Sequence, residues 1–238
     1  MPKLPEGDTL ILPELVQYLR LPPHIIDDLA QRQVLPGEHA GGRWRFRRSE
    51  VDRWLDLGMP GWSSDDLRVV AGALSGHGPS LASALLPSNV RLDVPARDGR
   101  DCFDAVVASL PLPSDVDRSV VLQQLLRREA LCSTALDHGV AIPHTPRTGP
   151  RVVPVNLVAF VRTLPPIDFG AADGERTDLF FFVFAVDQHA HLGLLSRVVT
   201  VAQFPRMTRL LRTTGTPEEV VAELRRTEQW LFGVEEEG

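Results

Sequence analysis

The sequence predicts an α/β domain that follows a smaller, separate N-terminal domain. Two apolar runs, VVPVNLVAFV and LFFFVFAV, are typical of buried strands. They alternate with segments whose apolar residues recur at helical spacing. The first sixty residues instead combine short helical patterns with an arginine-rich segment, so we expect one domain over residues 1–57, a linker over 58–80 and the α/β domain over 81–238.

Length, charge and hydropathy exclude several classes of protein. The chain has 238 residues and a net charge of −6, which argues against a chain devoted wholly to nucleic acid but leaves room for a local basic patch. The longest apolar runs are shorter than the roughly 20 residues of a membrane helix. The N-terminus lacks the apolar core of a signal peptide. We therefore expect a soluble, cytoplasmic protein.

The N-terminal segment begins with two predicted helices, over residues 13–19 and 23–33. Pro23 suits a first helical turn, where its missing N–H costs nothing. Gly41-Gly42 then predicts a turn before an alternating, strand-like segment, Arg43 to Phe46. Ser49 is expected to cap a third helix.

This order of helix, turn, helix, wing and helix is that of a small winged helix-turn-helix domain. Residues 8–57 resemble the excisionase-type members of the MerR-like superfamily, most specifically in GGRWRFRRSEVDRWL. The linker that follows is rich in glycine and serine, with one helical stretch predicted from Ser64 to Leu74. Such a linker is expected to allow relative domain movement.

Whether this first domain binds DNA is left open by its charges. The wing carries four arginines that suit DNA phosphates: Arg43, Arg45, Arg47 and Arg48. Alternation along the strand places Arg43, Arg45 and Arg47 on one face. The second helix, however, carries Asp27-Asp28 where a recognition helix normally presents basic or amide side chains. Residues 1–60 hold eight basic and nine acidic residues. The sequence therefore supports two hypotheses for this domain, DNA binding and a role as a protein-interaction module.

In the α/β domain, Ser114 is expected to start a helix through a capping-box-like sequence. Strands are predicted over residues 140–142, 152–161 and 178–186, and a further helix begins near His189. The last helix has the clearest start, with Thr216 as its cap and Pro217 at its first position.

Among seven histidines, His144 stands out because Pro143 and a short apolar strand hold it in a fixed pose at a strand end. The sequence shows no metal-ligand spacing, nucleophile elbow or glycine-rich phosphate loop, so no metal or cofactor is expected. Cys102 and Cys132 match no metal or redox spacing. Both have apolar neighbours and are expected to be reduced, buried thiols.

The segment RREALCSTALDHGVAIPH, Arg127 to His144, resembles the phosphohistidine motif of the enzyme IIA domains of the bacterial phosphotransferase system. The class is that of fructose and mannitol, which includes the nitrogen-regulatory branch. The resemblance extends through LASALLPSNVRLDVPARDGRD and through DLFFFVFAV and HLGLLSRV, and so covers about residues 81–230. It implies an α/β fold with a mixed sheet and flanking helices.

The resemblance also implies roles for individual residues. His144 becomes the phosphorylated histidine, His191 the second active-site histidine and Arg128 the motif arginine. Ser133 and Thr134 become the hydroxyl pair that supports the phosphate. A phosphoryl group that moves between protein side chains needs positioning and charge stabilisation, which imidazole and guanidinium groups supply.

His138 and His189 lie close to the two assigned histidines in the sequence, and the spacing to the following leucines favours His191 over His189. After His144, Thr145-Pro146 separate the histidine from Arg147, which departs from the family's pattern.

The function implied is that of a regulatory protein linked to the phosphotransferase system. A phosphohistidine carrier protein such as HPr, or its nitrogen-branch counterpart, would phosphorylate His144, and the phosphorylation state would alter binding of DNA or of a partner protein. Two alternatives stay open. The domain is either a sensing or docking module of a transcription regulator that forms no phosphohistidine, or a transport component that donates its phosphoryl group to an enzyme IIB partner.

Overall fold

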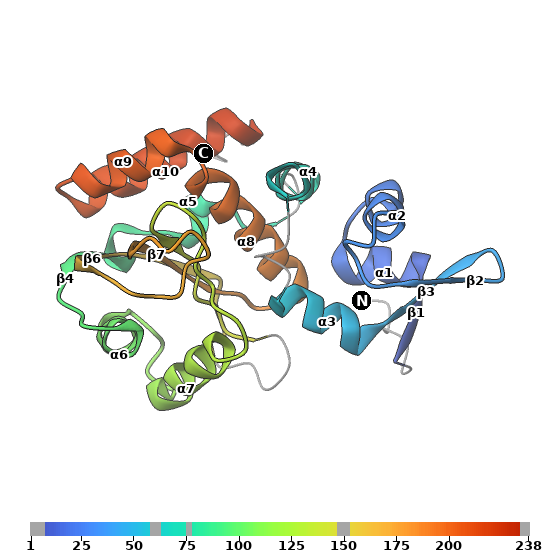
Figure 1. The fold of residues 1–238 in the computed structure, drawn as a ribbon, viewed down its shortest axis with the longest axis horizontal. Coiled ribbons are helices and arrows are strands. Elements are labelled where there is room, and N and C mark those ends of the chain that lie inside the picture. Colours follow the sequence, from blue (N-terminus) through green and yellow to red (C-terminus); the bar gives the residue numbers. More distant parts are fainter. Residues whose placement is uncertain (1–7, 58–62, 75–77, 147–152, 234–238) are drawn as a thin grey trace.

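The computed structural model describes residues 8–57, 63–74, 78–146 and 153–233 (Figure 1). The N-terminal part runs from a short strand through two helices and a hairpin into a third helix. Its elements are β1 (Thr9–Ile11), α1 (Leu12–Leu19), α2 (Pro23–Gln31), β2 (Glu38–Ala40), β3 (Arg43–Arg47) and α3 (Arg48–Leu57). The three strands form an antiparallel sheet in the order β1-β3-β2.

Alternation along β3 explains how this small sheet packs. Phe46 is fully buried, whereas Arg43, Arg45 and Arg47 are exposed. The predicted cap of α3 was wrong, because the helix begins at Arg48. Ser49 donates its N–H and its hydroxyl to the carboxylate of Asp8, at 3.1 and 3.0 Å. Asp8 therefore caps α3 from a distant part of the chain.

The rest of the described chain forms one mixed sheet with helices on both sides. Its elements are α4 (Ser64–Leu74), α5 (Leu81–Ala84), the 3-10 helix η2 (Pro87–Asn89), β4 (Val90–Val94), α6 (Gly99–Ser109), α7 (Arg118–Glu129), β5 (Val140–Ala141), β6 (Leu157–Ile167), β7 (Thr177–Phe184), α8 (Gln188–Ala202), α9 (Pro205–Thr213) and α10 (Pro217–Phe232). The strand order is β4-β6-β7-β5. β4 pairs with β6 in parallel, β6 with β7 in antiparallel, and β5 with β7 in parallel orientation.

The two faces of this sheet bury two apolar cores. Along β7, Phe180, Phe182 and Phe184 pack with residues of α6 and α7. Residues of the opposite parity, such as Phe181 and Val183, pack with α8, α9 and α10. Both faces of β7 are covered, which is why its sequence reads as a continuous apolar run rather than an alternating one.

Several predicted element boundaries shifted for identifiable reasons. α7 begins at Arg118 and not near Ser114, because the Asp117 carboxylate accepts the N–H groups of Ser119 and Val120 as the N-cap. β6 begins at Leu157, five residues after the predicted start. Thr216 does cap α10, as predicted, by accepting the Glu219 N–H at 3.3 Å.

The prediction of two buried thiols was half wrong. Cys102 is fully buried in α6, but Cys132 is exposed, because it lies in the turn that follows α7 and not on an apolar helix face. Burial raises the pKa of the Cys102 thiol to about 12.

The predicted helix from Ser64 to Leu74 is present as α4, and it lies beside α8 (Figure 1). Leu67, Val70 and Leu74 are fully buried and join one apolar core with residues of α8 and of the N-terminal part. The core therefore continues from the first sixty residues onto the α8 face of the sheet. Among the helices described, none combines the length and apolar character of a membrane span.

Candidate functional site

The sheet fixes the backbone of His144 directly. β5 pairs with β7 through Val140 and Ala141, and after two intervening residues the pairing resumes with His144 opposite Val183. The Val183 N–H donates to the Pro143 carbonyl at 2.9 Å. The histidine thus lies at the end of a strand and is held there by the neighbouring strand.

The hydrogen bonds of the His144 ring define its tautomer. Nδ1 lies 2.8 Å from the Ile142 carbonyl oxygen, which can only accept, so Nδ1 carries the hydrogen. The Nε–H of Arg128 donates to Nε2 at 3.0 Å. Nε2 therefore presents its lone pair and is the nucleophilic atom of the ring.

Arg128 is a buried cation, and one of its guanidinium nitrogens can donate a further hydrogen bond. It lies in the last turn of α7 and is 1% exposed. Its Nη1 donates to the Cys132 carbonyl at 2.7 Å, while its Nη2 is buried and has no hydrogen-bond partner among the described residues. Burial lowers the pKa of Arg128, and the charges of nearby acidic groups, Glu129 first, oppose that shift. The guanidinium remains protonated and can donate to an anion placed beside His144.

The loop after α7 is held by the hydroxyl groups that were assigned to the phosphate. Thr134 donates its N–H and its hydroxyl to the Glu129 carboxylate at 2.8 and 2.7 Å. The Ser133 hydroxyl donates to the Phe169 carbonyl at 2.7 Å and accepts from the Ala135 N–H at 3.1 Å. Both hydroxyls thus have partners within the protein and fix the loop whose Cys132 carbonyl orients Arg128.

Glu129 is a site residue that the sequence analysis missed. Burial raises the pKa of its carboxyl group, and the hydrogen bonds from Thr134 oppose that effect. Its position directly after Arg128 in the motif was the available signal. The resemblance to the motif gave a role to Arg128 and none to Glu129.

His191 lies across from His144 in the first turn of α8. The ring centroids are 5.2 Å apart and the ring planes meet at 68°, and His191 is 1% exposed. Asp187 caps this helix by accepting the Ala190 N–H at 2.8 Å. His191 therefore lies at the N-terminal, positive end of the α8 dipole, an environment that favours an anion.

An element from the first sixty residues closes the site. The main-chain carbonyl oxygen of Asp56, near the end of α3, lies 3.3 Å from Nε2 of His144. Asp56 is 3% exposed and His144 is 1% exposed. Close by, Nδ1 of His189 lies 3.4 Å from the Leu19 carbonyl oxygen. No sequence signal pointed to Asp56, because 88 residues separate it from His144.

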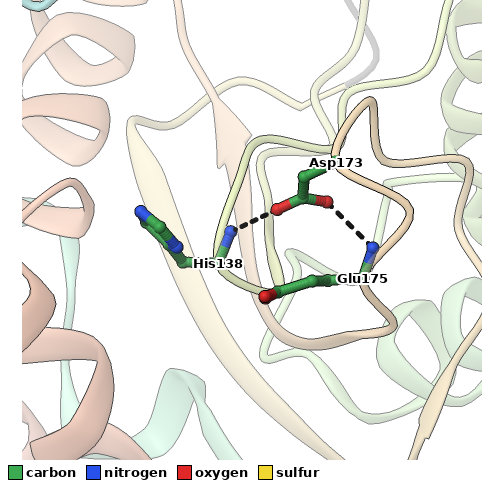
Figure 2. A group of neighbouring side chains, drawn as sticks. All are labelled: His138, Asp173 and Glu175. Atoms are coloured by element: carbon green, nitrogen blue, oxygen red, sulfur yellow. Dashed lines mark hydrogen bonds between the residues drawn. The ribbon is translucent and has the colours of Figure 1, made fainter.

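His138, the rival histidine before β5, lies on the surface with Asp173 and Glu175 (Figure 2). The potential metal-binding atoms of these three exposed side chains lie within 4.8 Å of one another. The Asp173 carboxylate, however, accepts the backbone N–H groups of His138 and Glu175, both at 2.9 Å. Asp173 thereby stabilises the turn in which His138 and Gly139 adopt left-handed φ angles of 65° and 74°.

The charged residues of the N-terminal part have mixed surroundings. Arg43, Arg45 and Arg47 are exposed on β3, whereas the guanidinium of Arg48 lies over the Tyr18 ring at 5.0 Å. The Asp27 carboxylate accepts the Trp44 indole N–H at 2.7 Å, so this acidic residue of α2 binds the hairpin.

Residues 84–227 match the family described as phosphoenolpyruvate-dependent sugar phosphotransferase system, EIIA 2. The fructose-specific EIIABC component of Bacillus subtilis is 24% identical over 59% of this chain, and the match covers 22% of that protein. The nitrogen regulatory protein of Pseudomonas aeruginosa is 28% identical over 58% of this chain and 90% of its own length. The crystal structure of nitrogen regulatory protein IIA-Ntr from Neisseria meningitidis aligns with a TM-score of 0.56 and 30% identity, over 60% of this chain and 98% of that one.

Proposed function

The chain belongs to the EIIA type 2 family of the phosphoenolpyruvate-dependent sugar phosphotransferase system, and from that premise we propose that Nε2 of His144 accepts a phosphoryl group from a phosphohistidine carrier protein. The observation that carries the proposal is the pair of hydrogen bonds on the His144 ring. The Ile142 carbonyl holds the hydrogen on Nδ1, and Nε2 keeps a lone pair beside a buried guanidinium.

The transfer is a displacement at phosphorus between two imidazoles. The Arg128 Nε–H must first release the Nε2 lone pair of His144. That lone pair then forms a new N–P bond while the N–P bond of the carrier's phosphohistidine breaks, and the departing imidazole retains the electron pair of the broken bond. The hydrogen stays on Nδ1 of His144 throughout and is donated to the Ile142 carbonyl. Because the sheet fixes the backbone of His144 and the Ile142 carbonyl fixes the ring through Nδ1, Nε2 is held in one position before the donor arrives.

Charge on the transferred group is stabilised by groups that are already in place. The Nη2 of Arg128 has no hydrogen-bond partner within the part of the chain that the structure describes and can donate to the group, and the His191 ring packs edge-on against the His144 ring. The N-terminal end of α8 adds a fixed positive potential. Donors that the fold already holds beside the reacting atom lower the cost of stabilising the transferred charge. Ser133, Thr134 and Glu129 contribute indirectly by holding the loop that orients Arg128.

We further propose that the chain is a regulatory protein whose phosphorylation state alters binding by its first domain, residues 1–57. Three helices and an arginine-bearing hairpin support the assignment of a winged helix-turn-helix there. The exposed side chains of Arg43, Arg45 and Arg47 suit contacts with DNA phosphates. The negative charge of Asp27 argues less strongly against DNA binding, because its carboxylate is bound to the Trp44 indole. The proposed carrier is HPr or its nitrogen-branch counterpart. The proposed location of the protein is the cytoplasm, where it would meet that carrier.

The test is transfer of labelled phosphate from a phosphorylated carrier to the full chain. The wild type and His138→Ala are expected to be labelled alike, because His138 lies on the surface away from His144. His144→Ala is expected to remain unlabelled while keeping its circular dichroism spectrum. Equal labelling of His144→Ala and wild type would overturn the assignment.

A further inference from the structure

We propose that α3 is an internal competitor of the phosphate donor: it docks over His144, and a donor reaches Nε2 only when α3 has left. The contact between α3 and His144 is present in the unphosphorylated protein. That this contact regulates phosphorylation rests on the proposed function. An undocked His144 is open to the donor, and a phosphorylated His144 cannot be covered by α3 again.

The contact between α3 and His144 blocks the reacting atom itself. The Asp56 carbonyl oxygen lies 3.3 Å from Nε2, which is a contact distance and leaves no space for a phosphorus atom with its oxygens. Both Asp56 and His144 are almost completely buried. A donor imidazole would have to approach the same side of the ring that carries the lone pair, so the two arrangements exclude each other.

The charges explain how the two states would be distinguished. Burial lowers the pKa of Arg128, and in the docked state the charge of Asp56 opposes that shift together with the larger effect of Glu129. A phosphoryl group on Nε2 carries close to two negative charges and would compete with Asp56 for this guanidinium. The phosphoryl group would also repel the Asp56 carboxylate and its carbonyl oxygen. Because these two anions cannot occupy the same space beside Arg128, phosphorylation shifts the equilibrium toward the undocked state.

The docked surface extends beyond one residue. The Leu19 carbonyl oxygen lies 3.4 Å from His189 at the start of α8, and α4 buries Leu67, Val70 and Leu74 in the core shared with α8. Arg32, the residue directly after α2, forms an ion pair with Asp66 of α4, which ties α4 to the first domain. Figure 1 shows α3 beside the N-terminal end of α8 and α4 along its side. Release of α3 therefore changes the surroundings of the whole first domain.

The first arm of the test measures access to His144 without any donor. The full chain is treated with diethyl pyrocarbonate, which modifies neutral accessible imidazoles, and the modified peptides are quantified by mass spectrometry. His138, which is exposed, serves as the internal reference. If the undocked state is populated to 10% or less, His144 is modified at least about tenfold more slowly than His138. Equal rates in the wild type would overturn the proposal.

The second arm weakens the contact with Asp56→Arg, which places a cation beside Arg128. Glu50→Arg makes the same change of charge on the exposed side of α3 and is the matched control. We expect Asp56→Arg to raise both diethyl pyrocarbonate modification of His144 and its rate of labelling by the carrier several-fold, whereas Glu50→Arg leaves both unchanged. Circular dichroism checks that α3 remains folded.

The two proposals fail in different ways. If His144 is protected in the wild type and exposed in Asp56→Arg, yet no variant is labelled by the carrier, docking stands and the phosphoacceptor assignment falls. If the carrier labels the wild type and Asp56→Arg at the same rate, while His144 and His138 react alike with the reagent, the phosphoacceptor assignment stands and docking falls.

Discussion

The Nε–H of Arg128 donates a hydrogen bond of 3.0 Å to Nε2 of His144, while its Nη1 is held by the Cys132 carbonyl at 2.7 Å. One buried guanidinium therefore joins the end of α7, the loop after it and the histidine at the end of β5. Its Nη2 has no hydrogen-bond partner among the described residues and can therefore donate to an incoming anion. The catalytic proposal depends on this three-way arrangement, which only a forked side chain provides.

Arg128→Lys tests that arrangement. A lysine keeps the charge but cannot contact Nε2, the Cys132 carbonyl and a phosphoryl oxygen with one fixed fork. We expect the rate of phosphate transfer to fall about 10²- to 10³-fold, as for the loss of a preorganised donor. Arg127→Lys, at the exposed neighbouring position, should transfer at the wild-type rate. A wild-type rate for Arg128→Lys would show that charge alone suffices.

Gly139→Ala should disturb β5 and with it His144. Gly139 has a φ of 74°, and a Cβ there would lie 2.5 Å from Nη2 of Arg212 and 3.0 Å from the Arg176 carbonyl oxygen. Gly174→Ala is a matched control, because Gly174 has the same φ and nothing within 4 Å of an added Cβ. Urea unfolding should show a loss of about 1–2 kcal/mol for Gly174→Ala, from the left-handed backbone alone. Gly139→Ala should lose a further 1–3 kcal/mol, roughly, from overpacking; equal losses would mean that the site around Gly139 relaxes freely.

Glu228 anchors α10 to the rest of the domain. Its carboxylate pairs with Arg197 at 2.8 Å and accepts the backbone N–H groups of Leu81 and Ala82, and both charged side chains are almost fully buried. Glu228→Ala should lower the free energy of unfolding by about 3–5 kcal/mol, because it leaves a buried charge without its partner. Glu223→Ala, which removes the surface pair with Arg226 on the same helix, should cost at most about 1 kcal/mol. Denaturant unfolding of the two variants compares them, and similar small losses would contradict the stabilising role given to Glu228.

The two cysteines should differ sharply in reactivity. Burial raises the pKa of Cys102 to about 12, so at pH 8 this group is a neutral, inaccessible thiol, whereas Cys132 is exposed. An alkylating reagent should therefore modify one thiol per chain in the native state and two after unfolding. Because Cys132 lies in the loop that orients Arg128, its modification with a bulky reagent should also slow phosphate transfer. Peptide mapping by mass spectrometry identifies the site, and native labelling of Cys102 would contradict the described packing.

Local signals in the sequence were sufficient for most of the α/β domain. Continuous apolar runs identified β6 and β7, and the Thr216 cap located the start of α10. The cap of α7 was misplaced because Ser114 and Asp117 both suit an N-cap, and only the observed backbone distinguishes them. The cap of α3 was missed for another reason: Asp8 reaches Ser49 across 41 residues, and no local pattern carries that contact.

The site was predictable where its residues share one motif and unpredictable where they do not. Arg128, His144 and His191 were named from the sequence, and the structure brings them together. The Ile142 carbonyl was not named, because a main-chain group acts through backbone geometry and not through residue type. Glu129 lies in the same motif and could have been named from its position directly after Arg128. Asp56 was beyond reach, since its contact with His144 depends on how the first domain packs on α8.

The position of the phosphoryl group on the ring tests the central proposal most directly. Phosphorylation of the full chain by its carrier, followed by two-dimensional ¹H–¹⁵N nuclear magnetic resonance of the histidine side chains, distinguishes the two ring nitrogens of His144. The hydrogen bond from Nδ1 to the Ile142 carbonyl predicts a phosphohistidine substituted at Nε2, with the hydrogen retained on Nδ1. A phosphoryl group on Nδ1, or on a residue other than His144, would contradict it.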